Sequence, residues 1–344
     1  MTRPVIGISF GRIVAAVVLP LTLVHGQTHG SNVPASIRPV FDRGLTFHKS
    51  GDTASAIRAF DEVIRLQPTF ARAYTLRGSA YMLKGDYYKA LADLNQAIRL
   101  DPKNAAAYCD RADLEQHFLG RPQNALADYD RAITLAPKFQ RAYFNRGISF
   151  LERHDYKRAV ADLTRSIQIM PKDLSAYAPR AYAYAKQGER ARAVADAKVA
   201  VTLKPSQLAL ARVTDLGLRG RAYQILSEPE LALRDFREAV RLSPNQETSY
   251  GNLGWFLSTC PNDRFRNGTE AVSAGKNACE LSHWQNSGFI DILAAAYAEA
   301  GDFDQAVKYE KQSLTDSSLA PKERQEREKR LALFQQRKPF RDEF

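Results

Sequence analysis

The sequence predicts an all-α solenoid, built from about eight helix-turn-helix units in a row. The first observation is a proline that recurs at spacings of 34, 35, 34, 34 and 39 residues, at Pro68, Pro102, Pro137, Pro171, Pro205 and Pro244. The second is that apolar residues between these prolines recur in steps of three and four, the period of an amphipathic helix. The third is the composition: 44% hydrophobic and 25% charged residues exclude disordered and fibrous classes.

The first 26 residues are expected to be a signal peptide. Arg3 and Arg12 precede an apolar run, Ile13–Val24, that is too short to span a bilayer and is followed by small and polar residues. A buried helix and an organelle transit peptide are the alternatives. Transit peptides are amphipathic, whereas this run is apolar all round, so the pattern favours export. We therefore expect a periplasmic or secreted protein, with a flexible linker over residues 27–36.

Each later unit has the pattern of two helices joined by a tight turn. In the second unit, Gly85 provides a left-handed cap for the first helix, and Asp86 is placed to cap the next one. Pro102 cannot continue a helix and ends the unit. Eight such units cover residues 37–316, and they begin near Ile37, Ala71, Ala105, Gln140, Leu174, Val213, Glu247 and Ser287.

These units resemble the tetratricopeptide repeat. Small residues recur in the first helix of each unit, helix A, at Gly44, Gly78, Ala112, Gly147, Ala181, Gly220, Gly254 and Ala294. An alanine recurs in the second helix, helix B, at Ala56, Ala90, Ala125, Ala159, Ala193, Ala232, Ala271 and Ala306. The resemblance implies antiparallel helix pairs in a right-handed superhelix, with the A helices lining a concave face. Residues 317–344 are then expected to form a capping helix and tail.

Residues 253–344 also resemble a C-terminal module found at the end of many bacterial tetratricopeptide proteins. The longer loop Cys260–Gly268 and the segment Ala294–Gly301 carry this likeness. It suggests a bacterial source and implies no reaction.

An ion pair within each repeat is predicted from two positions that change together. Six units have arginine just before the small residue of helix A, and five of them have aspartate three residues after the helix-B alanine. Repeats seven and eight replace both, by Leu253 and Leu293 and by Ala274 and Tyr309. We therefore expect half-buried arginine–carboxylate pairs between the two helices, and a ring of ligand-binding arginines is the alternative. The predicted pairs are Arg77–Asp93, Arg111–Asp128, Arg146–Asp162, Arg180–Asp196 and Arg219–Asp235.

A binding surface for a polypeptide is expected on the concave face. The helix-A positions that should face inward are rich in large apolar residues, namely Phe41, Met82, Leu83, Phe144, Ile148, Leu151, Tyr182 and Trp255. Several such side chains on one surface are typical of a binding site. For any single one of them, packing inside the solenoid is the alternative.

No catalytic or metal-binding pattern stands out in the sequence. There is no P-loop, no Gly-x-Ser-x-Gly, no His-Glu-x-x-His and no paired-cysteine spacing. Of the six histidines, His25 and His29 precede the first unit, and the other four lie far apart in different units. We therefore expect a protein that is not an enzyme and that needs neither cofactor nor metal.

Two functions remain. The first is an exported scaffold that holds an apolar or amphipathic polypeptide segment in its concave groove. The second is an electrostatic adaptor held on an anionic envelope surface by its positive charge. The full chain has a net charge of +11, and removing residues 1–26 leaves 47 basic against 38 acidic residues, or +9. Peripheral membrane contact fits that second function, whereas nucleic acid is its weakest form, because no basic cluster carries stacking aromatic residues. The sequence names neither the partner nor the oligomeric state.

Overall fold

The computed structural model describes residues 33–202, 209–317 and 319–342. The expected signal peptide, residues 1–26, and the first part of the expected linker lie outside this range. The described residues divide into two compact units, an N-terminal unit that ends at Arg146 and a C-terminal unit that begins at Gly147.

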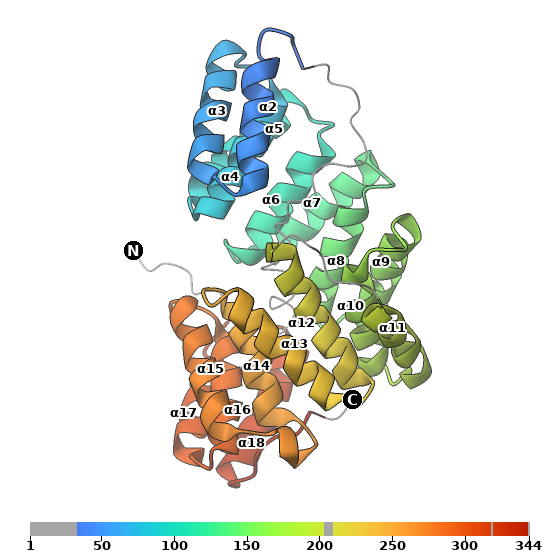
Figure 1. Ribbon diagram of the computed structural model, residues 1–344, viewed down its shortest axis with the longest axis vertical. Helices are drawn as coiled ribbons and strands as arrows, with labels where there is room; N and C mark the ends of the chain where they lie inside the picture. The colour runs from blue at the N-terminus through green and yellow to red at the C-terminus, as the bar shows by residue number, and fades with distance from the viewer. Residues whose placement is uncertain (1–32, 203–208, 318, 343–344) are drawn as a thin grey trace. The chain divides into compact units, whose positions relative to one another are not determined.

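The N-terminal unit consists of three helical hairpins and the first half of a further helix (Figure 1). Its helices are α2 (Arg38–Ser50), α3 (Thr53–Leu66), α4 (Ala71–Lys84), α5 (Tyr87–Leu100), α6 (Ala105–His117) and α7 (Pro122–Leu135). Helix α8 (Gln140–Glu152) crosses the division. Each hairpin corresponds to one predicted repeat, with helix A first.

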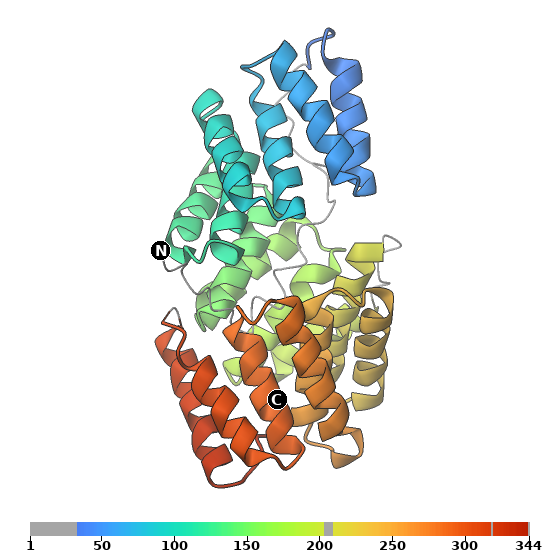
Figure 2. The ribbon, with the colours of Figure 1, turned by 90° about the vertical axis from the view of Figure 1, so that its left-hand side faces the viewer.

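The C-terminal unit continues the same alternation, as its green-to-red ribbons show (Figure 2). Its helices are α9 (Tyr156–Ile169), α10 (Leu174–Lys186), α11 (Arg190–Thr202), α12 (Ala209–Ile225), α13 (Pro229–Leu242), α14 (Glu247–Thr259), α15 (Gly268–Leu281), α16 (Ser287–Glu299), α17 (Phe303–Ser313) and α18 (Pro321–Gln335). A short 3-10 turn, Asp263–Phe265, lies in the long loop of repeat seven. Across the described residues every regular element is a helix, so the predicted all-α hairpin architecture is confirmed.

The turns between helices A and B follow from their residues. Gly51, Gly85, Gly188 and Gly301 all have φ near +80°, a conformation that L side chains rarely adopt. His154 and Ser227 take the same place in repeats four and six with φ of 56° and 59°. Asp86 stands at the N-cap but makes no capping hydrogen bond, because its carboxylate lies 3.3 Å from Lys84 Nζ and 3.4 Å from Lys89 Nζ.

Small residues let helix A approach helix B within each repeat. A Cβ atom added to Gly220 would lie only 2.5 Å from the ring of Phe236, and one added to Gly44 would lie 2.7 Å from the ring of Phe60. The helix-B alanines Ala90, Ala125 and Ala232 are fully buried at these crossings. Pairs of helices therefore pack closely, and the core of each unit is a row of small apolar clusters.

Candidate functional site

Bidentate ion pairs join helices A and B in four of the five predicted places. Arg77 donates from Nε and a terminal nitrogen to both oxygens of Asp93, each at 2.7 Å. The pairs Arg111–Asp128, Arg180–Asp196 and Arg219–Asp235 have the same geometry, with distances of 2.6–2.9 Å. Arg146 and Asp162 lie on opposite sides of the division between the units, so that pair is not described.

Four of the five arginines have a further partner that was not predicted from the sequence. Their other terminal nitrogen reaches back to helix B of the preceding repeat: Arg77 to Asp61, Arg111 to Asn95, Arg146 to Asp130 and Arg180 to Thr164. These acceptors all stand five residues after the helix-B alanine, a signal that the sequence contains. Arg77, Arg111 and Arg180 therefore each join three helices and link neighbouring repeats.

Most of the residues assigned to the concave surface are packed inside the repeats, which corrects the sequence assignment. Phe41 stacks edge-on against Phe70 with ring centroids 5.3 Å apart, and it clusters with Ala73 of the next helix A. Less than a tenth of the surface of six of these residues is exposed: Phe41, Met82, Phe144, Ile148, Leu151 and Trp255. Adjacent A helices lie so close that inward-pointing apolar side chains fill the space between them. Leu83 stays 38% exposed, and Tyr182 lines a cleft described below.

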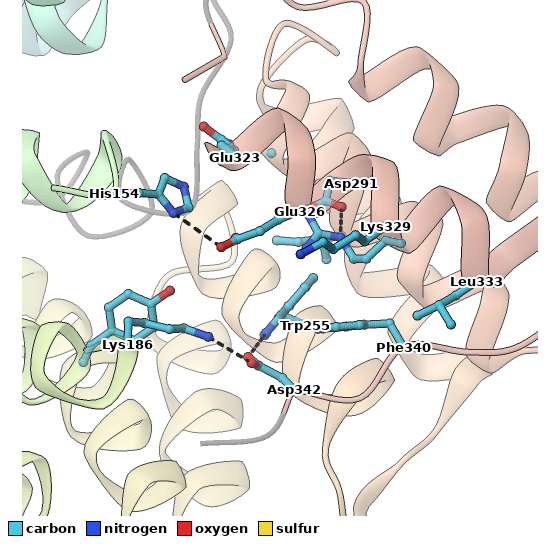
Figure 3. A pocket seen from close by; sticks show the side chains of 14 residues that line it. His154, Lys186, Trp255, Asp291, Glu323, Glu326, Lys329, Leu333, Phe340 and Asp342 are labelled. Carbon is cyan, nitrogen blue, oxygen red and sulfur yellow. Dashed lines mark hydrogen bonds and ion pairs between the residues drawn. The ribbon is translucent and has the colours of Figure 1, made fainter. Parts of the chain in front are cut away.

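A cleft of about 270 Å³ lies in the C-terminal unit between α18 and the A helices. Tyr182 and Lys186 of α10, Trp255 of α14 and Ile292 of α16 form one side. The other side comes from α18 and the segment after it: Glu323, Glu326, Lys329, Arg330, Leu333, Phe340 and Asp342 (Figure 3). Charged, aromatic and aliphatic side chains all line the cleft.

Helix α18 is anchored by buried charges. Arg330 binds both oxygens of Asp291 on α16, at 2.8 and 3.0 Å. Arg327, 1% exposed, donates to the carbonyl oxygens of Ser287 and Ser313 and to Glu323. Burial raises the pKa of Glu310, which lies 3.7 Å from Arg330, well above its usual range. The predicted capping helix therefore forms, and it is locked to repeat eight.

The segment after α18 lies across helix α14. The backbone N–H of Asp342 donates to the carbonyl oxygen of Thr259 at 3.0 Å. The Asp342 carboxylate accepts a hydrogen bond from Trp255 Nε1 at 2.8 Å and lies 3.5 Å from Lys186 Nζ (Figure 3). The chain thus covers one end of its own cleft.

The far end of the cleft is lined by His154 and Glu326. His154 Nδ1 lies 3.8 Å from a Glu326 oxygen and 2.8 Å from the Tyr156 hydroxyl. Burial lowers the pKa of His154, so its ring is neutral at pH 7 and this contact is a weak one. The cleft is suited to holding a segment through mixed polar and apolar contacts.

The described residues hold no group of three or more His, Cys, Asp or Glu side chains placed to bind a metal ion. Cys109, Cys260 and Cys279 are buried, and burial raises the pKa of each thiol, in Cys279 to about 12. These thiols are therefore protonated at neutral pH and poor nucleophiles. Within the parts of the chain that are described, no helix is both long enough and apolar enough to cross a membrane.

Comparison with known proteins gives matches to repeat families and to repeat structures. The tetratricopeptide repeat family matches residues 38–70, 71–104 and 118–179. No curated protein sequence matches the chain.

Three solved structures are similar. A crystal structure of a tetratricopeptide repeat protein from Parabacteroides merdae is 18% identical, with a TM-score of 0.54, over 76% of this chain and 98% of that one. A crystal structure of the APC/C hetero-tetramer Cut9-Hcn1 is 16% identical, with a TM-score of 0.57, over 74% of this chain and 48% of that one. MamA protein is 26% identical, with a TM-score of 0.41, over 48% and 91%.

The first two likenesses concern the fold alone. They agree with the helical pairs, the turn glycines and the family matches in the first half of the chain. The tetratricopeptide repeat family thus accounts for residues 38–104 and 118–179, and helical hairpins of the same kind continue through the rest of the described chain.

Proposed function

We propose that this chain is an exported, non-enzymatic scaffold that binds a polypeptide segment in the cleft of its C-terminal unit. Tetratricopeptide repeats serve generally as protein–protein interaction scaffolds. One observation carries the proposal further for this chain: the A helices already hold a polypeptide segment, residues 339–342 of the same chain. A surface that engages both a backbone N–H and the adjacent side chain is suited to peptide recognition.

The chemistry of the cleft supports an amphipathic ligand. Tyr182 and Leu333 are partly exposed apolar side chains in its lining, and an apolar side chain of a ligand that is buried against them contributes about 1.5–3 kcal/mol. Lys186 and Glu326 offer charges of both signs. A few such anchors suffice for micromolar affinity, about 8 kcal/mol. In the N-terminal unit, the exposed Leu83 remains a proposed contact.

The electrostatic adaptor is less favoured by the arrangement of charges. The arginines of the repeat pairs are bound to carboxylates, and the lysines of the cleft stand among Glu323, Glu326 and Asp342. A surface that binds a polyanion needs positive charge gathered without such neighbours.

Site-specific photo-crosslinking tests the scaffold. A photoreactive phenylalanine in place of Leu333, which lines the cleft, should crosslink a partner from an envelope extract. The same residue in place of Tyr88, 73% exposed on α5, is the matched control and should not. Crosslinks at Leu333 should persist from about 0.05 to about 0.5 M salt, over which the Debye length falls to about 4 Å. Loss at high salt, or equal yield at Tyr88, would favour the adaptor.

Export has its own test. The mature protein should begin near Gln27, because the apolar run and the polar residues after it fit a signal peptide. Mass-spectrometric sequencing of the native N-terminus should find this start, and an N-terminus at Met1 or Thr2 would contradict export.

A further inference from the structure

We propose that residues 339–342 are an internal occupant of a binding site for segments with an aromatic residue two positions before a carboxylate, and that a partner segment of this kind displaces them. This inference rests on the proposed scaffold function and adds the chemistry of its ligand and a means of regulation. The pattern is that of Phe340 and Asp342 in the chain itself.

The carboxylate of Asp342 is held by groups from consecutive A helices. Trp255 Nε1 on α14 donates to one oxygen, and Lys186 Nζ on α10 lies beside the other (Figure 3). Arg221 on α12 is partly buried nearby and donates to Asn252 at 2.6 Å. Burial lowers the pKa of Arg221 to about 10, and Tyr182 and the Asp342 carboxylate act in the opposite direction. An indole N–H and a lysine thus contact the carboxylate, with a second cation nearby, which suits an anionic group on a polypeptide.

The aromatic position is read by a different set of groups. The ring of Phe340 lies 5.8 Å from the ring of Trp255, and the Arg330 guanidinium lies 5.5 Å from the centre of the Phe340 ring. Arg330 is fixed by Asp291, so this surface does not depend on the tail for its geometry. An aromatic side chain from a partner would meet the same indole face and the same guanidinium.

The tail is joined to α18 by an exposed stretch and is held by its own local contacts. Phe334, the last large apolar residue of α18, is fully buried, and residues 335–338 are exposed. Beyond them Phe340 is half-buried, Arg341 pairs with Glu299 at 2.8 Å, and Asp342 is buried. Arg337 has a positive φ of 57°, so the chain turns sharply between α18 and the tail. Helix α18 can therefore stay locked to repeat eight while residues 339–342 leave the surface.

The cleft beside the tail gives a competitor a place to begin. About 270 Å³ remains open from Tyr182 to His154 and Glu326, next to the groups that hold Asp342. A longer segment can bind this open part first and then replace Phe340 and Asp342 at the covered end. Because a segment must displace the tail, its apparent affinity for the site is reduced, and only segments with the matching pattern bind tightly enough to compete.

A blocked peptide tests the site directly. The probe is a labelled peptide of residues 335–342, acetylated and amidated so that its only carboxylate is that of Asp342. It should bind a Phe340→Ala/Asp342→Ala variant of the full chain at least tenfold more tightly than the wild-type chain. A probe with asparagine in place of its aspartate should bind that variant at least tenfold more weakly. Equal affinity for the variant and the wild type, with both folded by circular dichroism, would overturn the inference.

The fluorescence of Trp255 reports whether the tail covers this side chain. The chain has two tryptophans, so Trp284→Phe leaves Trp255 as the only one. In that background, Phe340→Ala/Asp342→Ala should move the emission to longer wavelength, and the peptide should reverse the shift. Asp342→Asn alone, which keeps the side-chain volume, should give a smaller shift of the same sign. An unchanged spectrum would mean that the tail does not cover Trp255.

The control Tyr88→Ala/Asp304→Ala removes one ring and one carboxylate from exposed positions and should change neither the spectrum nor peptide binding.

Crosslinking at Leu333 separates this inference from the proposed function. The yield should rise at least threefold in the tail-released variant. Crosslinks of equal yield in both proteins would leave the scaffold standing and refute the internal competitor. No crosslinks in either protein would refute the scaffold itself.

Discussion

Repeats two, three, five and six join their helices with an arginine–aspartate pair, whereas repeats seven and eight use leucine at the same position. The arginines of the pairs keep 14–23% of their side-chain surface exposed. Leu253 is 5% exposed and Leu293 is fully buried. The arginine–aspartate pair thus occurs where the guanidinium is partly exposed to water, and leucine occurs where the same helix-A position is buried.

The covering of repeat eight explains the change. Leu293 belongs to one apolar cluster with Phe334 of α18. A charged pair at that position would lose its hydration on both partners, and an apolar replacement avoids this cost. A charged pair occurs instead between α18 and α16, where Arg330 binds Asp291. The C-terminal repeats thus exchange a regular pair inside each repeat for one buried cluster at the cap.

The largest expected effect comes from breaking the buried cluster. Arg330→Leu leaves Asp291 without its bidentate partner, and loss of one member of a buried pair costs about 3–5 kcal/mol. Hydrogen exchange in α16–α18 and denaturant melting should both show the loss. Lys329→Leu is the control, since Lys329 is exposed on the same helix. Equal destabilisation by the two changes would contradict the role of the cluster.

Asp113 is a buried carboxyl whose effect on the stability of the fold depends on pH. One oxygen of Asp113 accepts from Tyr129 and Asn145 at 2.6 and 2.7 Å, while the other makes no hydrogen bond within the described residues. Burial raises the pKa of Asp113 to about 6. A raised carboxyl pKa means that the folded state loses stability as pH rises from about 4 to about 6.

Asp113→Asn should therefore stabilise the protein at pH 7 and have little effect at pH 4. A rise in the pKa from 3.8 to about 6 limits the gain to about 3 kcal/mol. Urea unfolding at pH 4, 5 and 7 measures it. A difference between variant and wild type that does not change with pH would contradict the assignment to this carboxyl.

The pairs of the regular repeats should show an intermediate effect. Arg180→Leu leaves Asp196 partly buried and alone, which costs about 1–3 kcal/mol. The double variant Arg180→Leu/Asp196→Ala imitates repeat seven and should lose less than the single variant. Thermal melting of the two single variants and the double one forms the cycle. Additive losses would show that the two residues are not coupled.

The sequence predicts those parts of the structure that repeat. The period recurs in every unit, and the turn glycines and the arginine–aspartate pairs recur in several of them, so each instance supports the others. Even the acceptors missed at first, such as Asp61 and Asn95, stand at a fixed step in helix B. Local and periodic signals are thus sufficient for the hairpins and their ties.

The cleft could not be predicted because its contacts occur once. The hydrogen bond between Asp342 and Trp255 joins residues 87 positions apart and has no counterpart in another repeat. The burial of Phe144 and Ile148 was missed for a related reason. An inward apolar position has the same sequence pattern whether a neighbouring helix covers it or a groove exposes it. Which one holds depends on how closely successive A helices approach.

The smallest effect is expected in repeat one, where the pair is incomplete. Arg43 faces Ala59 instead of an aspartate, and its guanidinium reaches Glu62 at 2.9 Å with both side chains about half exposed. Exposed pairs of this kind contribute about 0–1 kcal/mol, since water solvates both partners when they separate. Arg43→Leu should therefore change the melting of the N-terminal unit by less than about 0.5 kcal/mol, well below Arg180→Leu. A loss as large as that of Arg180→Leu would mean that the arginine stabilises the repeat without its aspartate, and burial of the paired carboxylate would no longer explain the regular repeats.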